Sequence, residues 1–290
     1  MKFSFLASGE LGFTTLKAIH PLIELNFIAT DAKSKSIIDY AHQHKIPIFV
    51  GNPRNGKLFE FAQAFDCEIA LSINYLFIIE EVTVDLFKYP INFHGSLLPK
   101  YRGRTPHVWA IINNEKQTGI TAHLIDKDCD TGNIVLQKTV AIEDNDTGQS
   151  VLDKFKSIYP SLVKEVIDLL NKGEIVTFIQ DNSKATYFGK RTADDGEIDW
   201  NWQKERINNW VRAQSNPYPG AFTFYKGQKI IIDKISYSDL GYHQNTPNGY
   251  VVETSSKVII KTSNGTISLD EIRNKDVIFE KGAILGQNQD

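Results

Sequence analysis

The stretch KFSFLASGELGFTTLKAI, residues 2–19, shows the local pattern on which the fold prediction rests. Lys2–Ala7 is short and mostly apolar, which predicts a buried first strand. Ser8–Gly12 forms a turn, and the apolar residues from Phe13 to Ile19 recur at helical spacing. The chain therefore begins with a strand that is followed directly by a helix.

The same alternation continues through the first 190 residues. Further strands are expected at 26–29, 47–50, 68–73, 90–94, 120–125 and 133–140, and helices at 36–44, 58–65 and 150–170, the last interrupted near Pro160. Strands that alternate with helices predict an α/β fold with a mostly parallel sheet covered on both faces, in a Rossmann-like arrangement.

The pattern changes after about residue 185. A turn-rich boundary at 193–196 precedes an expected helix at 200–212, and short strands follow at 221–225, 229–236, 249–254, 258–262 and 266–272. Gly or Asn turns separate these strands, which predicts a smaller β-barrel-like (OB-like) domain. We therefore expect a first domain at 1–190 and a C-terminal β-rich domain at 191–290.

Composition and charge limit the function classes. The 290 residues are 41% hydrophobic and 23% charged, an ordinary globular balance, and the net charge of −3 gives no global reason to bind nucleic acid. Cys67 and Cys129 form no CxxC pair, as expected for reduced thiols in a cytoplasmic protein. No apolar stretch is long enough for a membrane span, and the N-terminal apolar run is too short for a signal peptide.

Two polar side chains lie at the end of the strand expected at 90–94. Asn92 and His94 are two residues apart, so both point to the same face of the strand. Ligands collect beyond the carboxyl ends of strands in open α/β sheets. There an imidazole can move a proton near neutral pH, and an amide can donate to a developing oxyanion. The spacing alone also allows His94 to be a structural histidine.

The acidic stretch DKDCDTG, residues 126–132, offers a candidate partner for His94. Its alternating Asp residues resemble a calcium loop, but Thr131 stands where a Gly is needed and Gln137 where a bidentate Glu is needed. One carboxylate can instead orient or charge-balance His94, or the stretch can be an exposed acidic turn. His42 and His44 fall on different faces of the expected helix, and we expect no metal.

The string Asn92-x-His94-x-Ser96-Leu97-Leu98-Pro99, followed by Asp130-x-Gly132, resembles the folate-dependent formyltransferases. Residues 95–104 look like the branch that acts on sugars, including the domain that formylates UDP-4-amino-arabinose. Residues 188–191 and 216–221 look like the C-terminal domain of the same family. The resemblance therefore extends over almost the whole chain.

This resemblance implies that an amine attacks the formyl carbon of N10-formyltetrahydrofolate, the co-substrate. His94 is expected to take the proton from the amine, and Asn92 to bind the tetrahedral oxyanion. Asp130 is expected to pair with His94 and to steer the proton to the leaving folate nitrogen. The residues expected to bind the folate are Tyr75, Leu76, Phe77, Ile78, Leu98, Asp126 and Cys129.

Three classes of amine compete as acceptor. Enzymes that formylate glycinamide ribonucleotide usually consist of the catalytic domain alone, and those that formylate methionyl-tRNA carry a basic insertion where this chain has only the short region 29–37. A dTDP-, UDP- or GDP-linked amino deoxy-sugar, carrying a 3- or 4-amine, fits better. Such an enzyme would serve surface polysaccharide (O-antigen or lipopolysaccharide) synthesis.

The substrate residues are expected at two turns. Ser8 and Gly9 offer backbone donors near a helix N-terminus, suited to a phosphate. Arg102 and Arg104 are expected to contact diphosphate, although solvated surface charges are an equal alternative. The second turn comprises Lys100, Arg102, Gly103 and Arg104.

Two other functions remain open at this point. One is a methionyl-tRNA formyltransferase, and the other is a catalytically silent module that binds folate or a nucleotide sugar. The resemblance further implies a homodimer in the cytoplasm, in which the C-terminal domain contributes to dimerisation.

Overall fold

The computed structural model describes residues 1–274 and 276–286, and the chain divides into two compact units. The first unit contains Met1–Pro106, Thr118–Ala141 and Asp153–Phe188, and the second contains His107–Gln117, Ile142–Leu152 and the chain from Gly189 onward. Two short stretches before residue 190 therefore pack with the C-terminal part of the chain.

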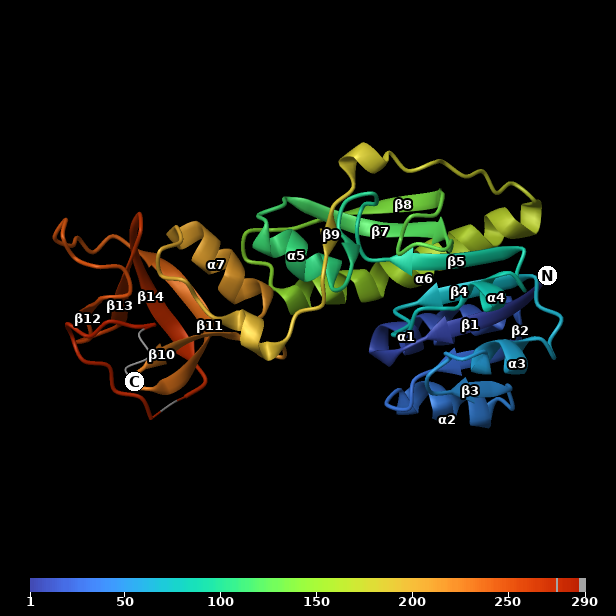
Figure 1. The fold of residues 1–290 in the computed structure, drawn as a ribbon, viewed down its shortest axis with the longest axis horizontal. Coiled ribbons are helices and arrows are strands. Elements are labelled where there is room, and N and C mark those ends of the chain that lie inside the picture. The colour runs from blue at the N-terminus through green and yellow to red at the C-terminus, as the bar shows by residue number, and fades with distance from the viewer. Residues whose placement is uncertain (275, 287–290) are drawn as a thin grey trace. The chain divides into compact units, whose positions relative to one another are not determined.

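The first unit is built on a seven-stranded sheet in the order β3-β2-β1-β4-β5-β7-β8 (Figure 1). The first five of these strands pair in parallel, and β7 runs antiparallel to β5, so the predicted mostly parallel sheet is confirmed. The strands are β1 (Lys2–Ala7), β2 (Glu24–Thr30), β3 (Ile48–Val50), β4 (Ile69–Ile73), β5 (Tyr89–His94), β7 (Gln117–Leu124) and β8 (Ile134–Ala141).

The direction of winding reverses at β1. The chain moves outward from β1 to β3 and then returns to place β4 on the other side of β1. Since crossovers are right-handed, this reversal puts the connecting helices on opposite faces of the sheet. The connecting elements are α1 (Gly9–Ile19), the 3₁₀ turn η1 (His20–Leu22), α2 (Lys35–Gln43), α3 (Lys57–Ala62) and α4 (Glu81–Val84).

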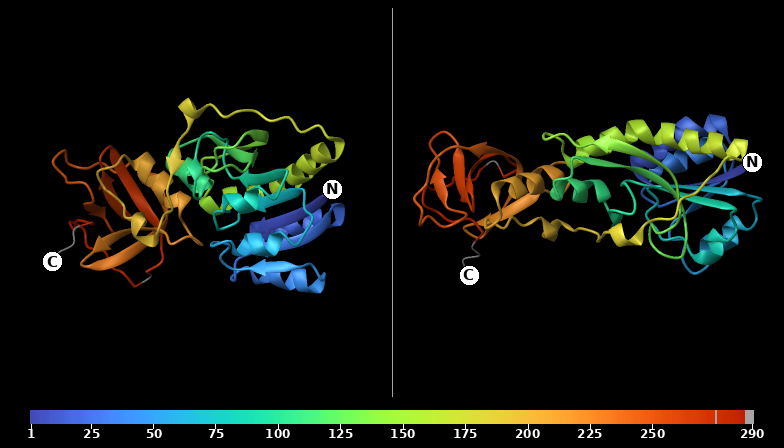
Figure 2. Two further views of the ribbon diagram at one scale, coloured as in Figure 1. Left: turned by 45° about the vertical axis from the view of Figure 1, so that its right-hand side comes forward. Right: turned by 90° about the horizontal axis from the view of Figure 1, so that it is seen from above.

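A long helix, α6 (Gly148–Lys172), runs along one face of the sheet (Figure 2). It continues through Pro160, so the predicted interruption is wrong. Buried residues on both sides of the proline, from Val151 to Leu170, pack the helix along its length and outweigh the missing backbone donor. None of the helices in the described residues is apolar and long enough to cross a membrane.

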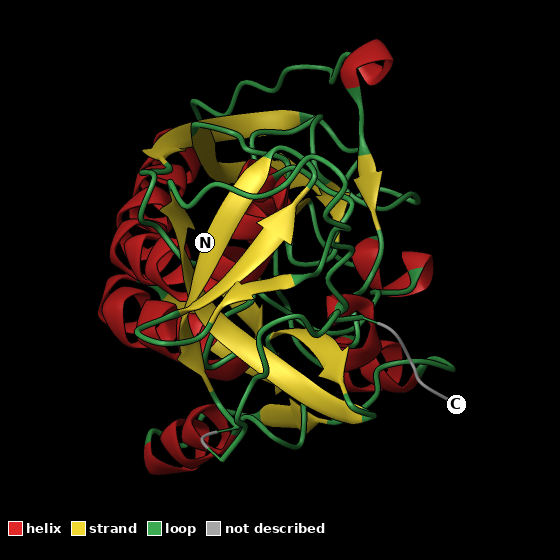
Figure 3. Ribbon diagram, turned by 90° about the vertical axis from the view of Figure 1, so that its left-hand side faces the viewer, coloured by secondary structure: helices red, strands yellow, loops and turns green. Residues whose placement is uncertain are grey.

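The core of the first unit lies on the central strands, which twist relative to one another (Figure 3). Phe5, Ile28, Leu71 and Ile91 come from four neighbouring strands, and each is fully buried. Such near-continuous apolar strands are typical of a parallel sheet that is covered on both faces. The buried strands therefore provide a rigid base for the loops at their carboxyl ends.

A short parallel pair joins two distant parts of the first unit. β6 (Arg102–Gly103) pairs with β9 (Tyr187–Phe188), which follows the 3₁₀ turn η2 (Asn182–Lys184). Gly103 has φ 104°, and a Cβ at this position would lie 2.2 Å from the Phe188 carbonyl oxygen. Only glycine permits this backbone approach.

The second unit contains an antiparallel sheet in the order β10-β11-β14-β13-β12. The predicted β-rich C-terminal domain is confirmed. Gly286 donates to Phe224 of β10 and Leu285 donates to Gly249 beside β12, so the end of the described chain joins both edges of the sheet. The strands are β10 (Ala221–Tyr225), β11 (Gln228–Ser238), β12 (Val251–Glu253), β13 (Val258–Thr262) and β14 (Gly265–Ile272).

The helix predicted at 200–212 begins later than the sequence predicts. α7 (Lys204–Ala213) starts four residues after the expected beginning, because Asp199 accepts bonds from the backbone of Asn201 and Trp202 and holds a turn there. The other elements are α5 (Pro106–Ile112) and the 3₁₀ turn η3 (Ala193–Gly196).

Replacement of Leu71 tests the importance of the central strands. Leu71→Ala removes a fully buried side chain from β4, and we expect a loss of about 2–5 kcal/mol in the unfolding free energy of the first unit. Leu22→Ala is the matched control, because Leu22 is 48% exposed and should change the stability by less than about 0.5 kcal/mol. Urea unfolding monitored by circular dichroism measures both, and equal losses would contradict this description of the core.

Candidate active site

The pairing of β5 with β7 brings three polar side chains together. Asn92 and His94 lie at the end of β5, and His123 of β7 stands directly opposite Asn92 in the antiparallel register. His94 and His123 are both buried, whereas Asn92 is half-buried. The predicted common face of Asn92 and His94 therefore also includes a histidine from the neighbouring strand.

A carboxylate lies between the two imidazoles. Asp130 is on the loop between β7 and β8, and its Oδ1 is 3.5 Å from His94 Nδ1 and 3.6 Å from His123 Nε2. Its Oδ2 accepts a hydrogen bond of 2.8 Å from the Gly103 backbone. Burial acts to raise the pKa of Asp130, but the interaction with the His94 imidazole and the bond from this amide outweigh burial and hold the pKa well below its ordinary range. The carboxylate is therefore charged at neutral pH.

A backbone carbonyl determines which nitrogen of His94 can act as a base. His94 Nε2 lies 2.7 Å from the Tyr101 carbonyl oxygen, which can only accept, so Nε2 carries the proton of the neutral ring. The other nitrogen, Nδ1, faces Asp130. Burial lowers the pKa of His94 below its ordinary value, and the charge of Asp130 opposes part of this change. His94 is thus neutral at physiological pH, and Nδ1 is its nitrogen without a proton.

His123 is a site residue that the sequence reasoning missed. The expected strand at 120–125 included this histidine, but nothing in the sequence gives the register of β7 against β5. The alternation of side chains along a strand places His123 on one face of β7. Only the pairing of β7 with β5 shows that this face meets Asn92. Across the described parts of the chain, no three His, Cys, Asp or Glu side chains are grouped so as to hold a metal ion.

Three residues predicted to bind folate, Leu98, Asp126 and Cys129, lie in the first unit, and one of them, Cys129, contacts Asp130. The Cys129 thiol donates to Asp130 over 3.3 Å, and burial, followed by the charge of Asp130, raises the pKa of the thiol to about 11. Leu98 is buried, and its backbone N–H donates to Thr121. The Asp126 carboxylate accepts from the backbone of its own turn.

The other predicted folate residues form the loop after β4. Leu76 and Ile78 are 43% and 66% exposed, and the rings of Tyr75 and Phe77 meet edge to face with centroids 5.5 Å apart. The Leu76 carbonyl accepts a bond of 3.0 Å from Arg104. The loop therefore presents apolar side chains to solvent and is tied to the turn that carries Arg104.

The turn after β1 differs from the expected phosphate site. Gly9 N–H donates to the Ser34 hydroxyl over 2.9 Å, and this hydroxyl donates to the buried Asp31 carboxylate. The backbone donor is therefore already engaged, and a negative charge lies behind it. Ser8 is itself almost fully buried. This arrangement gives no support to the expected contact of Ser8 and Gly9 with a phosphate.

The second predicted substrate turn has an exposed part and a buried part. Lys100 and Arg104 are exposed. Arg102 is 1% exposed, so its interpretation as a solvated surface charge is wrong. Its guanidinium donates to Gln180 and Asn182 over 2.7–3.2 Å and also to the Tyr187 hydroxyl. Because protein atoms take these donors, the geometry does not support a diphosphate contact for Arg102.

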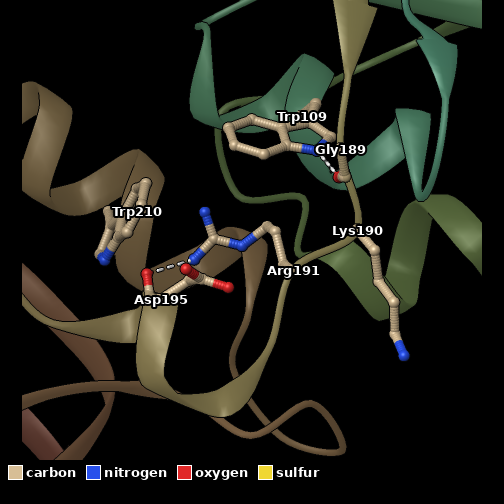
Figure 4. A pocket seen from close by; sticks show the side chains of 6 residues that line it. All are labelled: Trp109, Gly189, Lys190, Arg191, Asp195 and Trp210. Carbon is tan, nitrogen blue, oxygen red and sulfur yellow. Dashed lines mark hydrogen bonds between the residues drawn. The ribbon is translucent and has the colours of Figure 1, made fainter.

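The second unit contains a cavity of about 230 Å³, lined by Trp109, Gly189, Lys190, Arg191, Asp195 and Trp210 (Figure 4). The Arg191 guanidinium lies 5.1 Å from the centre of the Trp109 ring and 4.2 Å from that of Trp210. It also donates to the Asp195 carbonyl and the Gln214 side chain. These cation–π contacts stabilise the packing of the unit. The residues predicted for catalysis or binding are not among those that line this cavity.

Comparison with known families and sequences gives consistent matches. The model "Formyl transferase" matches residues 26–167, and "Formyl transferase, C-terminal domain" matches residues 190–279. A methionyl-tRNA formyltransferase from Caldanaerobacter subterraneus is 36% identical over 209 residues, 72% of this chain and 67% of that protein. The bifunctional polymyxin resistance protein ArnA from Wigglesworthia glossinidia brevipalpis is 36% identical over 242 residues, 79% of this chain but only 35% of that longer protein.

Solved structures share the fold. WlaRD, a sugar 3N-formyl transferase studied with dTDP and 5-N-formyl-THF, has a TM-score of 0.73 and 22% identity, and the match covers 94% of this chain and 98% of that one. An N-formyltransferase from Helicobacter canadensis, in complex with folinic acid and dTDP-3-aminofucose, has a TM-score of 0.71 and 23% identity over 93% and 98% of the two chains. Identities this low show a common fold.

Removal of the Asp130 charge tests the electrostatics of the site. In Asp130→Asn the pKa of His94 should fall further below its ordinary value, because the carboxylate that partly offsets burial is gone. His94 would then stay neutral to a lower pH. Titration of ¹⁵N-labelled imidazoles by NMR measures this change, with the exposed His42 as an internal reference. A His94 pKa that rises or stays constant would contradict the described pairing.

Proposed function

Because the chain belongs to the formyl transferase family, we propose that it moves a formyl group from N10-formyltetrahydrofolate to the free amine of a nucleotide-linked amino deoxy-sugar. The observation that carries formyl transfer is the meeting of Asn92, His94 and Asp130 at the end of β5. There a neutral base with one free nitrogen lies beside a charged carboxylate and an amide. A catalytically silent binding module needs neither this base nor the carboxylate and amide beside it.

In the proposed reaction the amine nitrogen attacks the formyl carbon, and the bond from that carbon to folate N10 breaks after the tetrahedral intermediate has formed. His94 Nδ1 takes the proton of the amine, since Nε2 is held by the Tyr101 carbonyl. The imidazolium then faces Asp130, which stabilises the added charge. The same proton passes to N10 of the leaving folate. Asn92 donates to the oxyanion of the intermediate.

The proposed folate site lies around this trio. Leu98 and Cys129 are next to the residues that position the catalytic groups, and the exposed Leu76 and Ile78 offer an apolar surface to the flat pterin ring. Lys100 and Arg104 are the exposed cations of the neighbouring turn and are suited to the phosphates of the acceptor.

Several observations favour an amino sugar as the acceptor. The solved structures that match nearly the whole chain include sugar N-formyltransferases whose names mention dTDP or a dTDP-amino sugar. The net charge of −3 and the two lysines of region 29–37 do not provide a basic surface for tRNA. Methionyl-tRNA is the second candidate, because a relative with that activity is 36% identical over most of this chain.

The product would enter a cell-surface polysaccharide, such as an O-antigen or lipopolysaccharide, by later glycosyl transfer. We further propose that the enzyme works in the cytoplasm as a homodimer. Light scattering at micromolar concentration tests the oligomeric state, and a monomer mass would refute this part of the proposal.

A direct assay distinguishes between the candidate acceptors. Purified protein is incubated with N10-formyltetrahydrofolate and, in parallel, with dTDP-, UDP- and GDP-linked 3- and 4-amino sugars or with methionyl-tRNA. We expect mass spectrometry to detect a formylated nucleotide sugar and no formylated tRNA. Formylation of methionyl-tRNA alone would establish the second candidate. Folate binding without transfer to any acceptor would refute the proposed chemistry.

The role of His94 gives a quantitative prediction. His94→Ala should lower kcat by at least about 100-fold, because general base catalysis contributes 10²–10⁴-fold. His42→Ala is the control, since His42 is an exposed histidine of the same unit, and its activity should equal that of the unchanged protein. Near-normal turnover in His94→Ala would remove His94 from the mechanism.

A further inference from the structure

The tautomer of His123 follows from one hydrogen bond. His123 Nδ1 lies 2.8 Å from the Leu124 carbonyl oxygen. A carbonyl can only accept, so Nδ1 must carry hydrogen. In the neutral ring the other nitrogen, Nε2, then has no hydrogen and can only accept. His123 is 2% exposed, so bulk water has little access to alter this arrangement.

The bare nitrogen of His123 faces the side chain of Asn92. The distance between His123 Nε2 and Asn92 Nδ2 is 3.1 Å, within the range of a hydrogen bond. The distance from the same Nε2 to Asp130 Oδ1 is 3.6 Å, beyond the range of an N–H···O bond. The geometry therefore favours a His123 ring that accepts from Asn92 through Nε2, over a ring that donates from Nε2 to Asp130.

This contact determines which end of the Asn92 amide is turned to His123. The oxygen and nitrogen of an amide are similar in size, and either can occupy the same place. Only the NH₂ group can face a bare ring nitrogen, so one N–H is used by His123 and the second remains. If the amide turned over, its oxygen would replace the remaining donor near the reacting group. A developing oxyanion would then meet a lone pair instead of an N–H.

We propose that His123 is a positioning residue: it holds the amide of Asn92 in the orientation that presents an N–H to the tetrahedral oxyanion. This inference rests on the proposed formyl transfer and adds a fourth side chain to that site. His123 acts through Asn92 and need not touch either substrate. The antiparallel register makes this contact direct, because Asn92 and His123 are partners across β5 and β7.

Two substitutions separate this role from a packing role. His123→Gln keeps an acceptor oxygen near the position of Nε2, whereas His123→Asn has a shorter side chain that cannot reach it. We expect His123→Asn to lower kcat by about tenfold to a hundredfold, as when an oxyanion donor is misplaced. Both KM values should stay within about twofold, and His123→Gln should recover most of the lost kcat. His42→Asn is the matched control at an exposed histidine.

A double-mutant cycle tests whether the effect passes through Asn92. In the Asn92→Ala background the change His123→Asn should cost less than about threefold, because there is no amide left to orient. An equal loss in both backgrounds would show that His123 acts independently, and an unchanged kcat in His123→Asn would also overturn the inference.

A spectroscopic measurement on the unchanged protein does not depend on the folding of the variants. The ¹⁵N shifts of His123 at pH 7.5 should show hydrogen on Nδ1 and a bare Nε2. A ring protonated on Nε2 at that pH would overturn the inference. If the unchanged protein transferred no formyl group, the proposed function would fail, while the ¹⁵N shifts would still show whether His123 Nε2 is the bare acceptor that the contact with Asn92 requires.

Discussion

The antiparallel pairing of β5 with β7 is the constraint on which the site depends. The other pairings from β3 to β5 are parallel, and their carboxyl ends supply loops to one edge of the sheet. β7 runs the opposite way, so its own C-terminal half lies beside the C-terminal part of β5, and His123 meets Asn92. A slip of one residue would turn His123 to the other face of the sheet. The proposed site therefore requires the register that pairs Asn92 with His123.

The pairing also creates an electrostatic problem, because it places a carboxylate in a nearly dry site. A buried charge is costly unless hydrogen bonds or opposite charges compensate for it. Asp130 Oδ2 receives the Gly103 amide and the Cys129 thiol, and the His94 imidazole approaches Oδ1. These contacts keep the carboxylate ionised. In the proposed reaction this charge would stabilise a proton on His94, so the same atoms would serve both the buried charge and catalysis.

The sequence predicts the parts of this arrangement that depend on local pattern. Strand and helix periodicity predicts the parallel sheet, and the spacing of Asn92 and His94 predicts their common face. Contacts between segments that are distant in the chain do not produce a periodicity or spacing pattern in the sequence. The register that adds His123 depends on pairing across 31 residues, and the Ser34 hydroxyl that occupies the Gly9 N–H comes from 25 residues away. Burial of Arg102 is unpredictable for the same reason, because its partners lie about 80 residues further along the chain.

The buried Arg102 explains how the Asp130 loop is held. Gln180 accepts from the Arg102 guanidinium with its oxygen and donates with its nitrogen to the backbone carbonyls of Asp130 and Gly132, at 2.9 and 2.8 Å. The loop is therefore fixed through its backbone by Gln180, and through its side chain by Gly103, the residue after Arg102. Arg102 and Gly103 are themselves held by the pairing of β6 with β9. Arg102, which the sequence places at a phosphate, instead helps to hold the Asp130 carboxylate within reach of His94.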